Sequence, residues 1–450
     1  MSNIYVVSVF LLSIVYLLVT IIKFKMNPFF SMFSASILVG AAVGMSPVDL
    51  VNAITSGFGG ILGSLGMVIG LGALLGAFLN ESKAIEQLAQ GVLKVSGKKH
   101  ASLAMTIIGY IVSIPVFMGS AYVILNPLCK NISKDTKKNV IVYSTALCVG
   151  LTVTHCMVIP TPGPLAVSSA LGANVGWFIF YAIVVSIPAA LVGGWLYGEL
   201  LGKKYPYEEP ENRNVQSATS EKIANAPSSR LSFSVILLPI VLILFGTVVP
   251  LLAPNTAISS VFSFLTAGSG LMSLLISVIF AMISLRKYIK TPYSKIISKT
   301  LNEQGEMIMI LGAGGAFGGI VKASNIGDCL VEMLSGMNIS VIVLAFVICL
   351  FLRAALGSAT VAMLTSASVA GPVAMQLGTN MVLLALAICA AGVGMTIPTD
   401  GGFWLYEKMD NFGIKKAFLG CSGGVTIASF VAFGIVLVLS TFAGVLPGLH

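Results

Sequence analysis

Long apolar blocks separated by short polar loops recur along the whole of the 450-residue chain. A transmembrane helix needs about 20 consecutive apolar residues. Ten blocks of roughly this length predict single crossings, at residues 4–22, 28–46, 59–79, 139–159, 174–200, 231–252, 258–285, 305–321, 380–398 and 417–446. The pattern therefore predicts an all-α polytopic membrane protein, with no room for a separate soluble domain.

Two further apolar blocks, 101–129 and 339–372, are too long for one crossing and short for two. Each contains residues that break a helix, Ser113-Ile114-Pro115 in the first and Gly357-Ser358-Ala359-Thr360 in the second. Broken backbone at membrane depth survives only where protein buries it or where it lines a cavity. We therefore expect two re-entrant hairpins, although two short full spans at each block would give the same topology.

Composition and charge agree with a membrane protein. Only 9% of the residues are charged and 57% are apolar, whereas about a quarter of a soluble chain is charged. The net charge of +9 would suit a nucleic acid partner, but the Lys and Arg residues fall in short loops, as the positive-inside rule requires. With both hairpins re-entrant, these loops share the cytoplasmic side and the N-terminus lies outside. The expected partner is a bilayer, the bacterial cytoplasmic membrane, and not a nucleic acid.

The chain divides into two membrane halves, 1–201 and 231–450, joined by a polar cytoplasmic linker at 202–230 that carries charges of both signs. The halves resemble each other, since Gly72–Leu88 recurs loosely as Gly314–Leu330, with Glu86 matching Asp328. In addition, Ile159–Gly163 recurs as Ile397–Gly401 at nearly the same offset. The charges give opposite directions to 59–79 and 305–321, which predicts an inverted repeat. Secondary transporters share this plan, with the site near mid-membrane between discontinuous helices.

Proline and glycine interrupt one span in each half, at 160–164 and at 398–402. Such breaks free backbone groups and aim the partly positive N-termini of half-helices at one place, where an anion can bind. Predicted substrate contacts are the residues of the two breaks: Thr161, Pro162, Gly163, Thr399, Asp400, Gly401 and Gly402. The alternative is a pair of proline kinks that only shape their helices.

Arg353 lies deep in an apolar block, beside the break at Gly357, Ser358 and Thr360. An Arg in the membrane costs at least about 2.5 kcal/mol to place and so needs a partner. It could form a two-pronged contact with a substrate carboxylate, with Gly357, Ser358 and Thr360 around the same ligand. A structural pair with Asp400 is the alternative.

Asp400 and His155 are the candidates for proton coupling. A carboxyl in an apolar site binds a proton more readily, so a protonated Asp400 could share the site with an anion. A sodium ion at Asp400 is the rival, and Asp400 could also cap the helix that follows it. His155, the only histidine within a predicted span, could relay a proton, contact substrate or be a core residue.

An enzyme fits the sequence poorly. Gly268-Ser269-Gly270 resembles a buried nucleophile superficially, but only His155 could assist it, and there is no HExxH motif. The seven cysteines are scattered without CxxC or Cys/His spacing, so neither a metal site nor a cofactor is indicated. A carrier is favoured over an anion channel by the inverted hairpins with few buried charges.

Four groups of residues together resemble the gluconate permease (GntP) family of the ion transporter superfamily. They are Thr154-His155 through Pro162-Gly163-Pro164, Gly312–Gly318, Arg353 with Gly357–Ala362, and Asp400 with Gly402-Phe403-Trp404. The resemblance implies a proton-coupled symporter of sugar acids such as gluconate, or of threonate, glycerate or D-serine. It also implies two re-entrant hairpins and is compatible with a homodimer. The family often has His where Thr161 stands, and Asn-Asp-Ser-Gly where this chain has Thr399-Asp400-Gly401-Gly402, which argues against gluconate itself as the substrate.

Overall fold

The computed structural model describes residues 3–24, 26–97, 100–210, 226–253, 256–324 and 340–449. This described part consists of helices and their connections, without a strand. Six of its helices are long and apolar enough to cross a membrane, or seven if a helix pair bent by 76° between Thr266 and Gly270 counts as one span. The prediction of an all-α polytopic membrane protein is confirmed. Several of the ten predicted crossings correspond to apolar helices of 10–17 residues.

The first half contains α1 (Asn3–Leu18), α2 (Pro28–Ala42), α3 (Pro47–Glu81), α4 (Ala84–Ser96), α5 (Ala101–Val112), α6 (Met118–Thr136), α7 (Ile141–Met157), α8 (Pro162–Ala170), α9 (Val175–Ala190) and α10 (Tyr197–Lys204). The second half contains α11 (Ser229–Leu252), α12 (Ala257–Ser284), α13 (Tyr293–Ala323), α15 (Val341–Leu356), α16 (Ala359–Gln376), α17 (Met381–Val393), α18 (Gly401–Asp410), α19 (Gly413–Ala417) and α20 (Gly424–Thr441). Each half thus has a long helix, then a pair of helices joined by a short break, then a broken helix and a last long segment.

Both blocks interpreted as hairpins form helix pairs broken where the sequence suggested. Residues 113–117 separate α5 from α6, and Gly357 with Ser358 separates α15 from α16. Residue 339, the linker residues 211–225 and Asp328 lie outside the described residues.

Several helices differ from their predicted bounds. Helix α3 begins at Pro47 instead of residue 59, because the Ser46 hydroxyl accepts a hydrogen bond from the Asp49 amide (3.1 Å) and caps the helix. Helix α13 begins at Tyr293, directly after Pro292. Hydropathy alone missed both extra segments because polar residues occupy them.

One helix, α4, was not predicted. It buries Ala84, Ile85, Leu88 and Ala89 on one face and is polar elsewhere, which is typical of an amphipathic helix. Conversely, the predicted span 380–398 ends as a helix at Val393.

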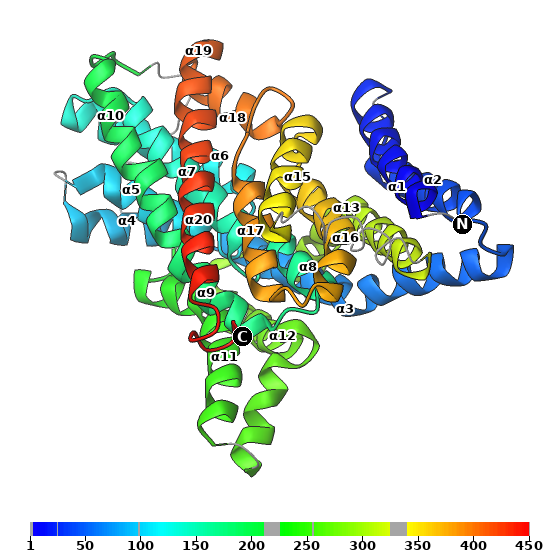
Figure 1. Ribbon diagram of the computed structural model, residues 1–450. Coiled ribbons are helices and arrows are strands. Elements are labelled where there is room, and N and C mark those ends of the chain that lie inside the picture. Colours follow the sequence, from blue (N-terminus) through cyan, green and yellow to red (C-terminus); the bar gives the residue numbers. More distant parts are fainter. Residues whose placement is uncertain are drawn as a thin grey trace.

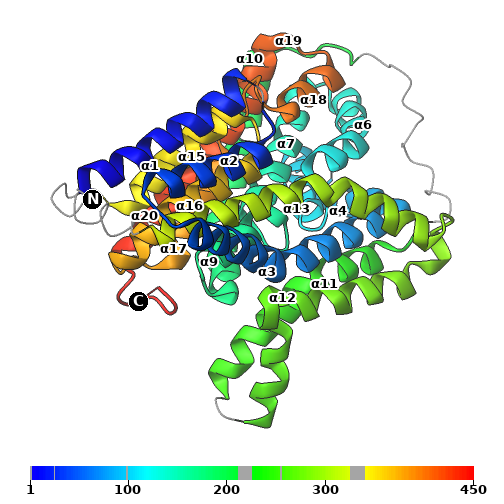
Figure 2. The same cartoon turned by 90° about the vertical axis from the view of Figure 1, so that its right-hand side faces the viewer.

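The two long helices α3 and α13 run alongside each other (Figure 2). Gly57 lies against the backbone carbonyl of Gly315, and Gly315 lies against the carbonyl of Gly57, so a side chain at either position would collide with backbone. Small residues that let helix backbones touch are the usual means of tight association between membrane helices. The glycine-rich stretch 312–318 therefore packs against α3.

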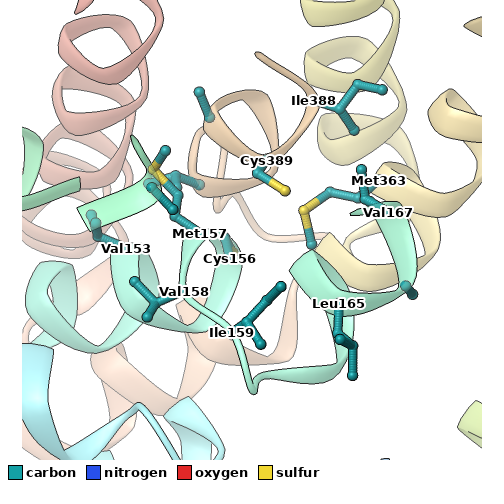
Figure 3. Packing of buried hydrophobic residues seen from close by; sticks show 14 of the residues in the cluster. Val153, Cys156, Met157, Val158, Ile159, Leu165, Val167, Met363, Ile388 and Cys389 are labelled. Carbon is teal, nitrogen blue, oxygen red and sulfur yellow. The ribbon is translucent and has the colours of Figure 1, made fainter. Parts of the chain in front are cut away.

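Helices α7, α17 and α20 contact one another in the centre of the molecule, while α11 and α12 project from one end (Figure 1). Every side chain of α7 is buried except that of His155, and all but Met381 of α17 are buried. Around the break that follows α7, Cys156, Met157, Val158 and Ile159 pack with Met363 of α16 and Cys389 of α17 (Figure 3). This core holds one broken helix from each half together.

Candidate functional site

The break in the first half lies between α7 and α8. Helix α7 ends at Met157, and α8 begins at Pro162 with Thr161 as its N-cap residue. Prolines 160, 162 and 164 lack the N–H group that a continuous helix would require. The Thr161 hydroxyl donates to the Val158 carbonyl, which satisfies one of the buried backbone groups freed by the break.

The break in the second half lies between α17 and α18, and it is fixed to the break of the α15–α16 pair. Helix α18 starts at Gly401, where the Asp400 carboxylate accepts a hydrogen bond from the Gly402 amide at 2.6 Å. Gly357 ends α15 with φ +70° and lies against the Thr399 carbonyl, so neither the conformation nor the space suits a side chain. The Thr399 hydroxyl also donates to the Ala354 carbonyl, at 2.8 Å.

A cavity of about 320 Å³, here called the central cavity, lies where these elements meet. Its walls come from the start of α6, from α7, from the α15–α16 break and from the start of α18. The lining residues are Phe117, Met118, Gly119, Thr152, His155, Cys156, Arg353, Gly357, Ser358, Ala359, Thr360, Thr396, Asp400, Gly401, Gly402 and Leu405.

Three helices present their N-termini to the central cavity. Residues 117–119 begin α6, residues 358–360 begin α16, and residues 400–402 begin α18. Ser358 and Asp400 cap their own helices, whereas no side-chain hydrogen bond caps α6 in the described part of the chain. Helix N-termini carry partial positive charge and unpaired N–H groups. The cavity is therefore suited to an anion.

Arg353 is 3% exposed and is held by three groups of its own half. Its Nε donates to the Gly392 carbonyl (3.1 Å), and its Nη2 donates to the Thr396 hydroxyl (2.9 Å) and forms an ion pair with the Asp400 carboxylate. Its Nη1 has no hydrogen-bond partner among the described residues. The guanidinium is thus anchored on one side and has a free donor on the other.

His155 faces the cavity from α7. Its Nδ1 atom is buried and has no hydrogen-bond partner in the described structure. The imidazole lies beside the Phe117 ring, with 5.8 Å between the ring centroids. An unpaired buried ring nitrogen is costly unless a ligand or water satisfies it, which fits a contact with a guest in the cavity.

Eight of the twelve predicted site residues line the central cavity: His155, Arg353, Gly357, Ser358, Thr360, Asp400, Gly401 and Gly402. Thr161 and Pro162 line a smaller cavity of about 10 Å³, which shares His155 and Phe117 with the central one. Gly163 instead lies against the Met363 side chain. The two breaks are therefore neighbours, but the second contributes most of the cavity wall.

Several lining residues escaped sequence reasoning. Thr152 lies three residues before His155 on α7, and Cys156 lies four residues after Thr152, so helical spacing could have found both in turn. Phe117 and Met118 directly follow the predicted break of the first hairpin. Their apolar side chains do not distinguish them in the sequence from residues of the core.

The fold and the central cavity define a class of protein, a multi-pass membrane transporter. Residues 5–442 match the pattern of the family described as GntP family permease. The chain belongs to the GntP permease family, as the resemblance implied.

Two relatives support this assignment, and one solved structure shares the fold. The D-serine transporter DsdX of Escherichia coli (strain K12) is 34% identical over 445 residues, which are 98% of this chain and 99% of the relative. A gluconate permease of Bacillus licheniformis is 32% identical over 446 residues, covering 96% and 98%. The crystal structure of the Alcanivorax borkumensis YdaH transporter, described as having an unusual topology, has a TM-score of 0.67 at 17% identity. It covers 87% of this chain and 88% of its own. That structure is a likeness in fold.

Proposed function

We propose that this protein is a secondary active transporter of the bacterial cytoplasmic membrane that imports a small organic acid together with a proton. The observation that carries the proposal is the Arg353–Asp400 ion pair at the wall of the central cavity. Arg353 is the cation that a substrate carboxylate would pair with, and Asp400 already forms an ion pair with its Nη2 atom.

Competition for Arg353 supplies a coupling mechanism. With Asp400 ionised, its carboxylate already balances the charge of Arg353. An incoming substrate carboxylate then gains little net attraction and is repelled by the neighbouring Asp400 carboxylate. With Asp400 protonated, Arg353 keeps its anchors at Gly392 and Thr396 and can form a charge-assisted pair with the substrate. Proton and anion then enter together, and neither binds well alone.

The other predicted contacts complete the binding site. The N-termini of α6, α16 and α18 would stabilise the substrate carboxylate. The hydroxyls of Ser358 and Thr360, and the His155 ring, would read hydroxyl or amino groups of the substrate. D-serine and gluconate, which appear in the relatives' names, both carry a carboxylate and a hydroxyl. The substrate class is therefore a small hydroxy or amino acid, or a sugar acid.

The repeated order of elements supports an inverted repeat of two membrane halves. Alternating access would follow from movement of the hairpin and broken-helix elements against α3 and α13. The site residues all lie on the moving elements in this arrangement.

Purified protein in liposomes tests the proposal. A panel of sugar acids, hydroxy acids and D-amino acids is screened for uptake under an imposed proton gradient and, separately, a sodium gradient. We expect accumulation of at least one acid with the proton gradient. Accumulation only with sodium would replace the proton by sodium in the mechanism, and steady conductance at rates far above carrier turnover would identify a channel.

A further inference from the structure

A second cavity, here called the vestibule, lies between α3, the start of α6 and α13. Its volume is about 110 Å³. The polar lining residues are Asn80, Glu81, Ser120, Lys299, Thr300, Glu303 and Gln304. None of them was singled out by the sequence, and none belongs to the central cavity.

The vestibule contains a buried polar group that lacks a partner. Gln304 is 7% exposed, and its side-chain oxygen has no hydrogen-bond partner among the described residues. Its neighbours Lys299 and Glu303 are mostly exposed and lie 4.0 Å apart. A buried amide without a partner costs about 1–3 kcal/mol, so the position favours a molecule that fills the cavity and bonds to Gln304.

Phe117 connects the vestibule to the central cavity. It lines the vestibule, the small cavity beside Thr161 and the central cavity. Helix α3 ends at Glu81 and α13 begins at Tyr293, next to the basic loops that the positive-inside rule assigns to the cytoplasm. The vestibule therefore lies between the central cavity and that side.

We infer that the vestibule is a second binding station for the transported acid, occupied between release from the central cavity and escape to the cytoplasm. The inference rests on the proposed transport function. Four neutral polar residues, Asn80, Ser120, Thr300 and Gln304, share the lining with apolar residues and with three charged ones. Lys299 pairs with Glu303, and the exposed Glu81 carboxylate accepts a hydrogen bond from the Thr291 hydroxyl. The Gln304 side-chain oxygen can accept a hydrogen bond from a hydroxyl or amino group of the acid and is the main contact. Phe117 separates this site from the central cavity.

Transport kinetics from the cytoplasmic side test this role. In inside-out membrane vesicles, Gln304→Leu should raise the half-saturating concentration of gluconate or D-serine about three- to tenfold, the effect of one lost hydrogen bond. Uptake from the opposite face, measured in right-side-out vesicles, should change less than twofold, because the acid there reaches the central cavity first. Asn302→Leu is the matched control, since Asn302 is exposed on the same helix and lines neither cavity.

Labelling tests occupancy directly. A small anionic thiol reagent should modify Gln304→Cys from the cytoplasmic side, and gluconate or D-serine should slow the reaction. Asn302→Cys should show no such protection, and the wild-type protein reports the background from native cysteines.

Equal half-saturation for Gln304→Leu and wild type, or no protection by whichever of these acids the wild-type protein transports, would overturn the inference. Protection by sodium alone would also overturn it, in favour of a cation site. Failure of the proposed function looks different: the wild-type protein would then transport no acid. If only the vestibule inference fails, Gln304→Leu transports normally, whereas Arg353→Ala, which lacks the proposed contact with the substrate carboxylate, does not transport the acid.

Discussion

The Arg353 guanidinium and the Asp400 carboxylate form an ion pair that joins the last turn of α15 to the N-cap residue of α18. The two residues come from different structural units, the α15–α16 helix pair and the broken helix α17–α18. The pair therefore has a structural role in addition to the proposed role in coupling, and the two roles predict different results.

The structural role predicts energetic coupling between the two residues. Arg353→Ala leaves the Asp400 carboxylate without its cation, and Asp400→Asn leaves the guanidinium without its counter-charge, so each single change should destabilise the protein. The double variant should lose less than the sum of the two, with an interaction of about 0.5–3 kcal/mol, the range for residues in contact. Thermal unfolding of the four purified proteins in one detergent measures it. Strict additivity would contradict the pair as a structural element.

The proposed coupling role predicts that Asp400→Asn separates exchange from accumulation. Asn keeps an oxygen to cap α18 and to accept from Arg353, but it cannot cycle a proton. Exchange of labelled for unlabelled acid should persist, while accumulation driven by a proton gradient should disappear. Preloaded liposomes measure both quantities on the same preparation. If Asp400→Asn still accumulates the acid against its gradient, Asp400 does not carry the proton.

His155 should contribute to substrate binding through its unpartnered ring nitrogen. His155→Ala is expected to raise the KM for uptake about three- to tenfold, the loss expected for one hydrogen bond. His100→Ala is the control, because His100 is exposed and lines none of the three cavities described. An unchanged KM in the His155 variant would mean that this histidine only fills space.

Gly357 should be intolerant of any side chain. Gly357→Ala adds the cost of a left-handed conformation, about 1–2 kcal/mol, and forces the Thr399 carbonyl away from the α15–α16 break. Gly378 provides the comparison, because it has φ +64° but open space around it. Gly378→Ala should therefore lose only the conformational term. Equal melting temperatures for the two variants would show that the contact with Thr399 is not tight.

Much of this architecture could be predicted from the sequence. Long apolar runs indicate membrane helices, and proline and glycine within these runs indicate where the helices are interrupted. The isolated Arg353 in an apolar block required a partner, and Asp400 at a break was an evident candidate. The role of Phe117 could not be foreseen, since an apolar residue gains a position at a cavity only through packing. Likewise, Gln304 occupies a polar helical segment that hydropathy treats as a loop.

The contact between Gly57 and Gly315 predicts a further sensitivity. Gly57→Val should push α3 away from α13 and reduce the yield of folded protein, because the neighbouring atoms are backbone and cannot rotate aside. Gly60→Val, on the same helix but with nothing within 4 Å, should be tolerated. Size-exclusion profiles of the two detergent-solubilised variants compare them. Matching profiles would contradict close backbone contact at this crossing.

The central cavity takes its positive ends from α6, α16 and α18, which belong to three separate segments of the chain. Each end attracts an anion only over a short range, within the first turn of its helix. A shift of one segment by a few ångströms would thus lower the affinity for the bound anion without breaking a covalent bond or changing a protonation state. Tight binding and rapid release of the anion then correspond to two arrangements of the same N-terminal backbone N–H groups.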